Sequence, residues 1–166
     1  MEANDNINVK SYLLFTIENE KYGAGVHNVL NILEIQPITK IPKAPAYMKG
    51  IINLRGVVLP VIDTRIKLDM TPTEFTDNTC IVVMDFKLDD EIIHLGALVD
   101  SVDSVYEINE NEIERTPNIG NGYRTEFITG VAKVNEHFVM ILDLVKLFTS
   151  DEISCLKKSN DKQITN

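Results

Sequence analysis

The fold is decided by the stretch Gly50-Ile-Ile-Asn-Leu-Arg-Gly-Val-Val-Leu-Pro-Val-Ile-Asp63. It holds two short apolar runs around Arg55-Gly56, and this pair suits a tight turn because glycine adopts positive φ at little cost. Valine and isoleucine dominate both runs, and such β-branched side chains fit a pleated sheet. The closing Asp63 can accept hydrogen bonds from the free amides of a helical first turn. The stretch therefore predicts strand, turn, strand and then a capped short helix.

The same pattern recurs in the second half of the chain. Residues 130–143 begin with a glycine, end with Asp143 and keep the apolar positions of 50–63. A second pair of segments, 23–32 and 96–105, shares Gly, Ala and two Val in register. A chain in which the same order of predicted strands and turns occurs twice most simply forms two small barrels packed together. The junction between the barrels would form a groove.

Further apolar runs of strand length extend this pattern in both directions. The predicted strands are 11–17, 22–26, 51–54, 57–62, 80–86, 92–99, 104–108, 128–134 and 137–142. Turn residues separate them at Asn19-Glu20, Arg55-Gly56, Asp89-Asp90 and Asn135-Glu136. This spacing is typical of an all-β barrel or sandwich.

Helical signals are few. A 3.6-residue period links Val26, Val29, Leu30 and Leu33, and a second short helix is predicted from Leu144 to Phe148. Asp143, like Asp63, is expected to cap the helix that follows it.

The 166 residues allow one compact domain or two small subdomains. We expect a flexible N-terminus at 1–10, an ordered region at 11–152 and a polar tail at 153–166. The ordered region divides into approximate halves 11–70 and 79–152, because 70–78 is rich in Thr, Asp and Pro. Exchange of strands between the halves stays open.

Composition excludes several classes of function. The formal charge of -9 disfavours nucleic acid and anionic membranes as partners. The start of the chain lacks an apolar signal region and no run is long enough to span a membrane, so we expect a cytoplasmic protein. Cys80 and Cys155 form no disulfide framework, and Cys80 is expected to pack in the core. The three histidines have no metal-ligand spacing, so neither a metal nor a cofactor is expected.

No set of residues points to catalysis. The chain has no glycine-rich phosphate loop and no nucleophile elbow, and its carboxylates cluster in solvated loops. An enzyme remains a disfavoured alternative, as does a nucleic-acid-binding barrel. Arg55 is either a surface turn residue or a guanidinium placed to make an ion pair or a partner contact.

Residues 50–65 resemble the signature segment of the CheW family of chemotaxis coupling proteins. Further segments fall in the family's order, namely 12–17, 21–23, 38–42, 44–48, 77–79, 96–100 and 127–130. The resemblance covers residues 11–152. It implies two five-stranded SH3-like β-barrels around a hydrophobic groove, with short helices.

The resemblance also implies a function and a set of residues. A CheW-like protein is a non-catalytic adaptor between the cytoplasmic tip of methyl-accepting chemoreceptors and the regulatory domain of the histidine kinase CheA. It is cytoplasmic, recruited to arrays at the inner membrane and monomeric when isolated. The receptor-binding groove carries over onto Val29, Ile32, Arg55, Val102 and Val105, although the four aliphatic residues could equally be core. Fold-forming roles carry over onto Gly50, Gly56, Pro60 and Asp63.

This chain departs from the family at one position of the groove. The family often has a glutamate immediately before the residue matching Ile32, whereas Asn31 stands here, with Glu34 the nearest acid. The alternative functions within the family are a coupling module of a non-motility chemosensory pathway and a detached relative of the kinase's regulatory domain.

Overall fold

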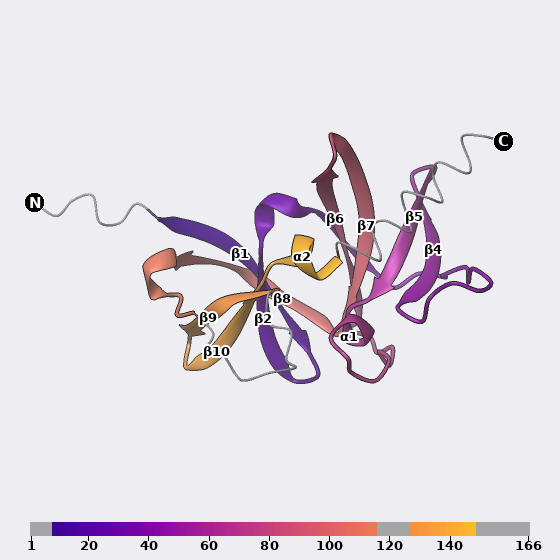
Figure 1. Ribbon diagram of the computed structural model, residues 1–166. Coiled ribbons are helices and arrows are strands. Elements are labelled where there is room, and N and C mark those ends of the chain that lie inside the picture. The colour runs from indigo at the N-terminus through magenta and orange to yellow at the C-terminus, as the bar shows by residue number, and fades with distance from the viewer. Residues whose placement is uncertain (1–7, 116–126, 149–166) are drawn as a thin grey trace, which may run out of the picture.

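The computed structural model describes residues 8–115 and 127–148, and in these it is built almost entirely of strands (Figure 1). Ten strands form two curled five-stranded sheets, which confirms the predicted all-β, SH3-like architecture. Sheet A has the order β8-β1-β2-β10-β9, and sheet B has the order β3-β6-β7-β5-β4. The strands are β1 Val9–Ile17, β2 Glu20–Gly25, β3 Val29–Glu34, β4 Met48–Leu54, β5 Val57–Asp63, β6 Cys80–Leu88, β7 Glu91–Val99, β8 Ser101–Asn109, β9 Ile128–Val134 and β10 His137–Leu142.

The sheets exchange strands in a reciprocal way. The strand β3 follows β2 in the sequence but pairs with β6 of sheet B, and β8 follows β7 but pairs with β1 of sheet A. The chain therefore crosses between the sheets after β2 and again after β7. In Figure 1 the strands of sheet A and the labelled strands of sheet B form separate groups, with α2 (Leu144–Phe148) between them.

Tight turns join the four hairpins of the fold. Each has positive φ at both central residues, as type I′ turns require: Glu18 and Asn19, Arg55 and Gly56, Asp89 and Asp90, and Asn135 and Glu136. Three of these pairs match the predicted turns, whereas the first turn lies one residue earlier than Asn19-Glu20. The shift follows from the pairing of Glu20 with Ile17, which makes Glu20 the first residue of β2.

The helix predicted from Val26 to Leu33 is wrong. Val26–Asn28 forms a single 3-10 turn, and the chain then continues as the strand β3. The side chains of β3 alternate between half-buried and exposed positions, and pairing with β6 satisfies its backbone. Sheet pairing therefore overrides a weak helical period. The C-terminal helix α2 is confirmed.

Three clusters of apolar side chains stabilise the molecule. One lies inside sheet A around Leu14 and Ile141, and another lies inside sheet B around Val61 and Ile81. The largest cluster, here called the shared core, takes residues from both sheets and from α2, among them Phe15, Met84 and Phe148. Cys80 is half-buried against the shared core, which agrees with its predicted packing role. Cys155 lies outside the described residues.

The sequence repeat has a structural counterpart. The backbone amide of Asp63 donates to the carbonyl of Tyr47, and that of Asp143 donates to Phe127, each at 2.7 Å. Isolated β-bridges join Thr39 to Ile51 and Glu114 to Val131 at matching places of the two hairpins. The parallel pairings also correspond: Val61 lies opposite Gly96, and Ile141 lies opposite Gly23.

Candidate partner-binding groove

The four aliphatic residues predicted for the groove all point to the junction between the sheets. In sheet B, Val29 lies opposite Met84 and Ile32 opposite Val82. In sheet A, Val102 lies opposite Phe15 and Val105 opposite Leu13. Directly opposed residues share a face of a sheet, and these four opposing residues belong to the shared core.

A β-bulge in each edge strand makes this arrangement possible. Residues three apart lie on opposite faces of a regular strand. In β3 the pairing with β6 skips one residue between Val29 and Asn31. In β8 the pairing with β1 skips one residue between Val102 and Ser104. The extra residue in each bulge brings the two aliphatic side chains of that strand back to the same face of the sheet. Val29 and Ile32 therefore both face the junction, and so do Val102 and Val105.

Burial divides the four residues into two kinds. Val29 and Val102 are half-buried and pack against the shared core. Ile32 is 41% exposed and Val105 is 57% exposed. The edge strands β3 and β8 thus each carry one half-buried aliphatic side chain and one exposed aliphatic side chain. Packing against the core therefore describes Val29 and Val102, whereas the groove interpretation stays a prediction for Ile32 and Val105.

Cys80 lies beside the candidate groove, at the start of β6. It is paired in register with Glu34, the last residue of β3. Burial raises the pKa of the Cys80 thiol, the backbone of Val102 lowers it through a hydrogen bond, and the charge of Glu34 raises it. Val102 of sheet A therefore lies next to the β3–β6 edge of sheet B. These contacts bring one end of β8 close to the end of β3.

Arg55 occupies the tip of the β4–β5 hairpin rather than the edge strands. Its φ of 54° is left-handed, and the following turn is closed by the Asn53 side chain, which accepts from the Gly56 amide at 2.7 Å. Its side chain is exposed, and no carboxylate of the described residues makes an ion pair with it. Asn31, which replaces the family's usual glutamate, accepts instead from the amide of Ile32.

The signature residues around Arg55 have distinct surroundings. A Cβ atom on Gly50 would lie 2.2 Å from the carbonyl oxygen of Thr39, and φ there is +151°. A Cβ atom on Gly56 would meet no neighbour within 4 Å, but φ there is +85°. Glycine is favoured at this position because it adopts positive φ without strain. Pro60 lies opposite Ile51, immediately before the parallel pairing of β5 with β7 begins at Val61. A residue without an amide hydrogen is tolerated at such a point.

The predicted cap at Asp63 is present, and it does more than cap the helix. Its carboxylate accepts from the amide of Arg65, at the start of α1 (Thr64–Lys67), at 3.0 Å. It also accepts from the amide and the hydroxyl of Thr73, at 3.0 and 2.7 Å. Asp143 accepts from the amide of Lys146 at 3.0 Å, which confirms the second predicted cap.

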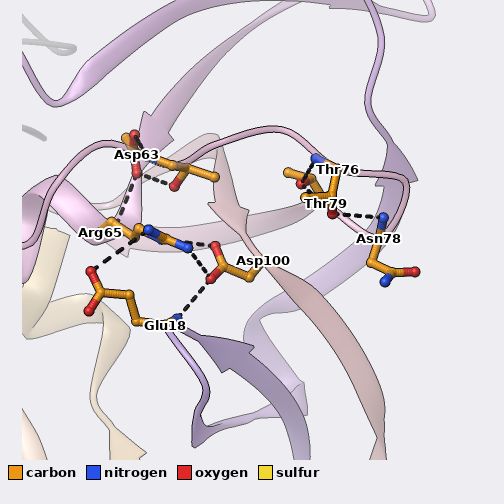
Figure 2. A network of polar contacts seen from close by, with 8 residues as sticks. Glu18, Asp63, Arg65, Thr76, Asn78, Thr79 and Asp100 are labelled. Atoms are coloured by element: carbon orange, nitrogen blue, oxygen red, sulfur yellow. Dashed lines mark hydrogen bonds and ion pairs between the residues drawn. The ribbon is translucent and has the colours of Figure 1, made fainter.

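A polar network fixes the crossover from β7 to β8, and sequence reasoning did not find it (Figure 2). Arg65 donates through Nε and Nη2 to both carboxylate oxygens of Asp100, at 3.0 and 2.5 Å. The amide of Glu18 also donates to Asp100, and the Glu18 carboxylate lies 3.7 Å from Arg65. The hydrogen bond to Asp100 is the main cause that raises the pKa of Arg65. Each residue follows an apolar segment of the sequence, but no local pattern indicates that the two meet.

The described residues contain no group of three or more His, Cys, Asp and Glu that could hold a metal ion. Within the same part of the chain, no helix is long and apolar enough to cross a membrane.

Comparison with known proteins connects this geometry to a family. The model of the CheW-like domain matches residues 11–152. The chain belongs to the CheW-like domain family. The chemotaxis protein CheW of Klebsiella aerogenes is 31% identical over 145 residues, which cover 87% of this chain and 85% of that protein. The chemotaxis protein CheW of Bacillus subtilis is 36% identical over 105 residues, or 63% of this chain and 65% of that protein.

A solved structure of the CheW family supports the same assignment. The crystal structure of the scaffolding protein TtCheW from Thermoanaerobacter tengcongensis has a TM-score of 0.73 and 31% sequence identity. The likeness covers 86% of this chain and 94% of that one. The CheW-like fold expected from residues 50–65 is therefore confirmed over most of the chain.

Proposed function

We propose that this protein is a non-catalytic adaptor that couples methyl-accepting chemoreceptors to the histidine kinase CheA. The observation that carries the proposal is membership of the CheW-like family over residues 11–152. Relatives bear the names chemotaxis protein and scaffolding protein. The protein acts by holding two partners in contact, and the kinase supplies the chemistry.

The receptor tip binds along the edge strands β3 and β8. Ile32 and Val105 offer exposed aliphatic surface there, above the half-buried Val29 and Val102. Covering an aliphatic side chain of this size contributes up to about 1.5–3 kcal/mol. An edge strand also leaves backbone groups unpaired on its outer side, which gives a partner further points of attachment.

Arg55 contributes a charge to partner binding. Its exposed guanidinium has no ion pair within the described residues, and Asn31 cannot supply one. A carboxylate on a partner can therefore bind its planar fork of donors without first displacing an internal acid.

The kinase partner is the regulatory domain of CheA, and the protein is a cytoplasmic monomer until the receptor arrays at the inner membrane recruit it. The second candidate function is a coupling module of a non-motility chemosensory pathway. Asn31 supports this alternative, because an amide in place of the glutamate that the family often carries there would present a different surface to a receptor.

Titration calorimetry with a receptor-tip fragment tests the groove. We expect Val105→Asp to weaken receptor binding by about tenfold or more, because a carboxylate replaces apolar contact surface. Arg55→Ala should weaken it by a smaller factor.

Val58→Asp is the matched control, since Val58 is 61% exposed and lies in β5 rather than in an edge strand of the groove. Equal loss of binding in Val105→Asp and Val58→Asp, with both variants folded by circular dichroism, would contradict the groove assignment.

A further inference from the structure

A second candidate surface lies beside sheet B, and none of its described lining residues belongs to the shared core. A depression of about 540 Å³ is lined by the segment between β3 and β4, by Lys49 and by Phe75. Its apolar floor comes from Ile35, Pro37 and Ile38. The Phe75 ring is 48% exposed, an unusual position for a large aromatic side chain.

The sequence around this depression differs in charge from the rest of the chain. Between Ile35 and Ile62 there is no aspartate or glutamate, although the whole chain has 25 of them. The charged residues of that stretch are all cations, namely Lys40, Lys43, Lys49 and Arg55. A local positive charge on an acidic protein selects for acidic partners, both in binding and in the encounter rate.

Two of these cations, Lys40 and Lys49, line the depression. Lys40 is exposed and makes no ion pair within the described residues. The ammonium group of Lys49 lies 5.9 Å from the centre of the Phe75 ring and 3.9 Å from the buried carboxylate of Asp63. Glu74 is the exposed acid that adjoins Phe75 in the sequence. The rim thus offers one free ammonium group and one held against an aromatic face.

The segment that forms the floor of the depression is hydrogen-bonded to β4. Thr39 exchanges both backbone hydrogen bonds with Ile51, at 2.9 and 2.8 Å, and Gly50 packs directly against Thr39. A preformed apolar surface lowers the entropy cost of binding. We propose that this depression binds an acidic segment of a partner protein, with a bulky apolar side chain seated beside Phe75 and flanking carboxylates on Lys40 and Lys49.

The test is an amide NMR titration of the full chain with a defined probe. The probe is the peptide acetyl-Glu-Asp-Glu-Leu-Phe-Asp-Glu-amide, and its matched control carries Gln and Asn in place of the acids. We expect chemical-shift changes centred on residues 35–40, Lys49 and Phe75, and at least about tenfold weaker binding of the neutral peptide.

Variants locate the site. Lys40→Glu and Phe75→Ser should each weaken binding of the acidic peptide by about tenfold, and added salt should weaken it in the wild type. Lys133→Glu, an exposed lysine on the hairpin strand β9, should leave the affinity unchanged. Both Lys40 and Phe75 are exposed, so the variants are expected to fold, and circular dichroism checks this.

Three results would overturn the proposal. The first is shift changes centred on β3 and β8, and the second is equal binding of the acidic and neutral peptides or none at millimolar concentration. The third is a concentration-dependent dimer in sedimentation velocity that Lys40→Glu abolishes, since a second copy would then be the occupant. Val105→Asp should not change peptide binding, so failure here and failure of the receptor groove are distinguishable.

Discussion

The two crossovers between the sheets have matching backbone hydrogen bonds but different side chains. At the β7–β8 crossover the Arg65 guanidinium donates two hydrogen bonds to Asp100 and forms an ion pair with Glu18. At the β2–β3 crossover the repeat places His27 where the other half has Asp100, and Val145 where it has Arg65. There a cavity of about 850 Å³ opens, lined by both of these residues.

The difference teaches which features the repeat preserves. Matching backbone hydrogen bonds and bridges are kept in both halves, because they define the hairpins and their close approach. The side chains at the crossovers are not kept. The β7–β8 crossover is held by charge-assisted hydrogen bonds, whereas at the β2–β3 crossover the neutral side chain of Asn28 donates to the carbonyl of Asp85 at 2.9 Å.

The two cap aspartates should show the largest difference in stability. Asp63→Ala leaves the buried amide and hydroxyl of Thr73 without their acceptor, so we expect the free energy of unfolding to fall by about 3 kcal/mol. Asp143→Ala removes a single described cap bond and should cost about 1 kcal/mol. Urea denaturation of both variants measures the difference. Equal losses would mean that the Thr73 contacts contribute nothing.

The ion pair at the β7–β8 crossover should have the next largest effect. Arg65 and Asp100 have side chains 15% and 19% exposed and share two hydrogen bonds. A double-mutant cycle with Arg65→Met and Asp100→Asn should give a coupling energy of about 1–2 kcal/mol.

Lys10 and Glu110 line the cavity at the opposite crossover and provide the control pair. They lie 2.9 Å apart but are much more exposed, so the equivalent cycle should show no measurable coupling. Similar coupling energies in the two pairs would contradict the view that an ion pair stabilises the β7–β8 crossover but not the β2–β3 crossover.

The smallest effect is expected at Thr64, which the repeat matches with Leu144. Thr64 is buried, and its hydroxyl oxygen has no hydrogen-bond partner among the described residues. Thr64→Val removes an unsatisfied polar group at nearly constant size, so the free energy of unfolding should rise by about 1 kcal/mol. A thermal melt checks this, and a lower melting temperature would show that the hydroxyl is satisfied in solution.

Local sequence signals were enough for most of the fold. Each predicted strand overlaps an observed strand, because β-branched runs separated by turn residues carry the information within a few neighbours. The strand β3 was missed because its apolar spacing imitates a helix and its pairing with β6 depends on residues far along the chain. The first turn was misplaced by one residue for a similar reason, since register is set by pairing.

The candidate site was predicted only where the repeat or the family carried it. Val29 and Val102 occupy matching places in the repeat, and both pack at the junction. Arg65 and Asp100 were not linked, since their contact spans 35 positions and two elements of different type. Their roles depend on three-dimensional proximity, which no local pattern encodes. The receptor contacts assigned to the groove residues stay predictions, and so does the contact with the regulatory domain of the kinase.

The most direct test of the account is a bridging experiment. Purified kinase CheA is sedimented with membranes that carry a chemoreceptor, with and without this protein. The account predicts that the kinase sediments with the membranes when the wild-type protein is added, and that Val105→Asp, folded by circular dichroism, largely abolishes this recruitment. Kinase sedimentation that is unaffected by adding the wild-type protein would contradict the proposal that it couples the two.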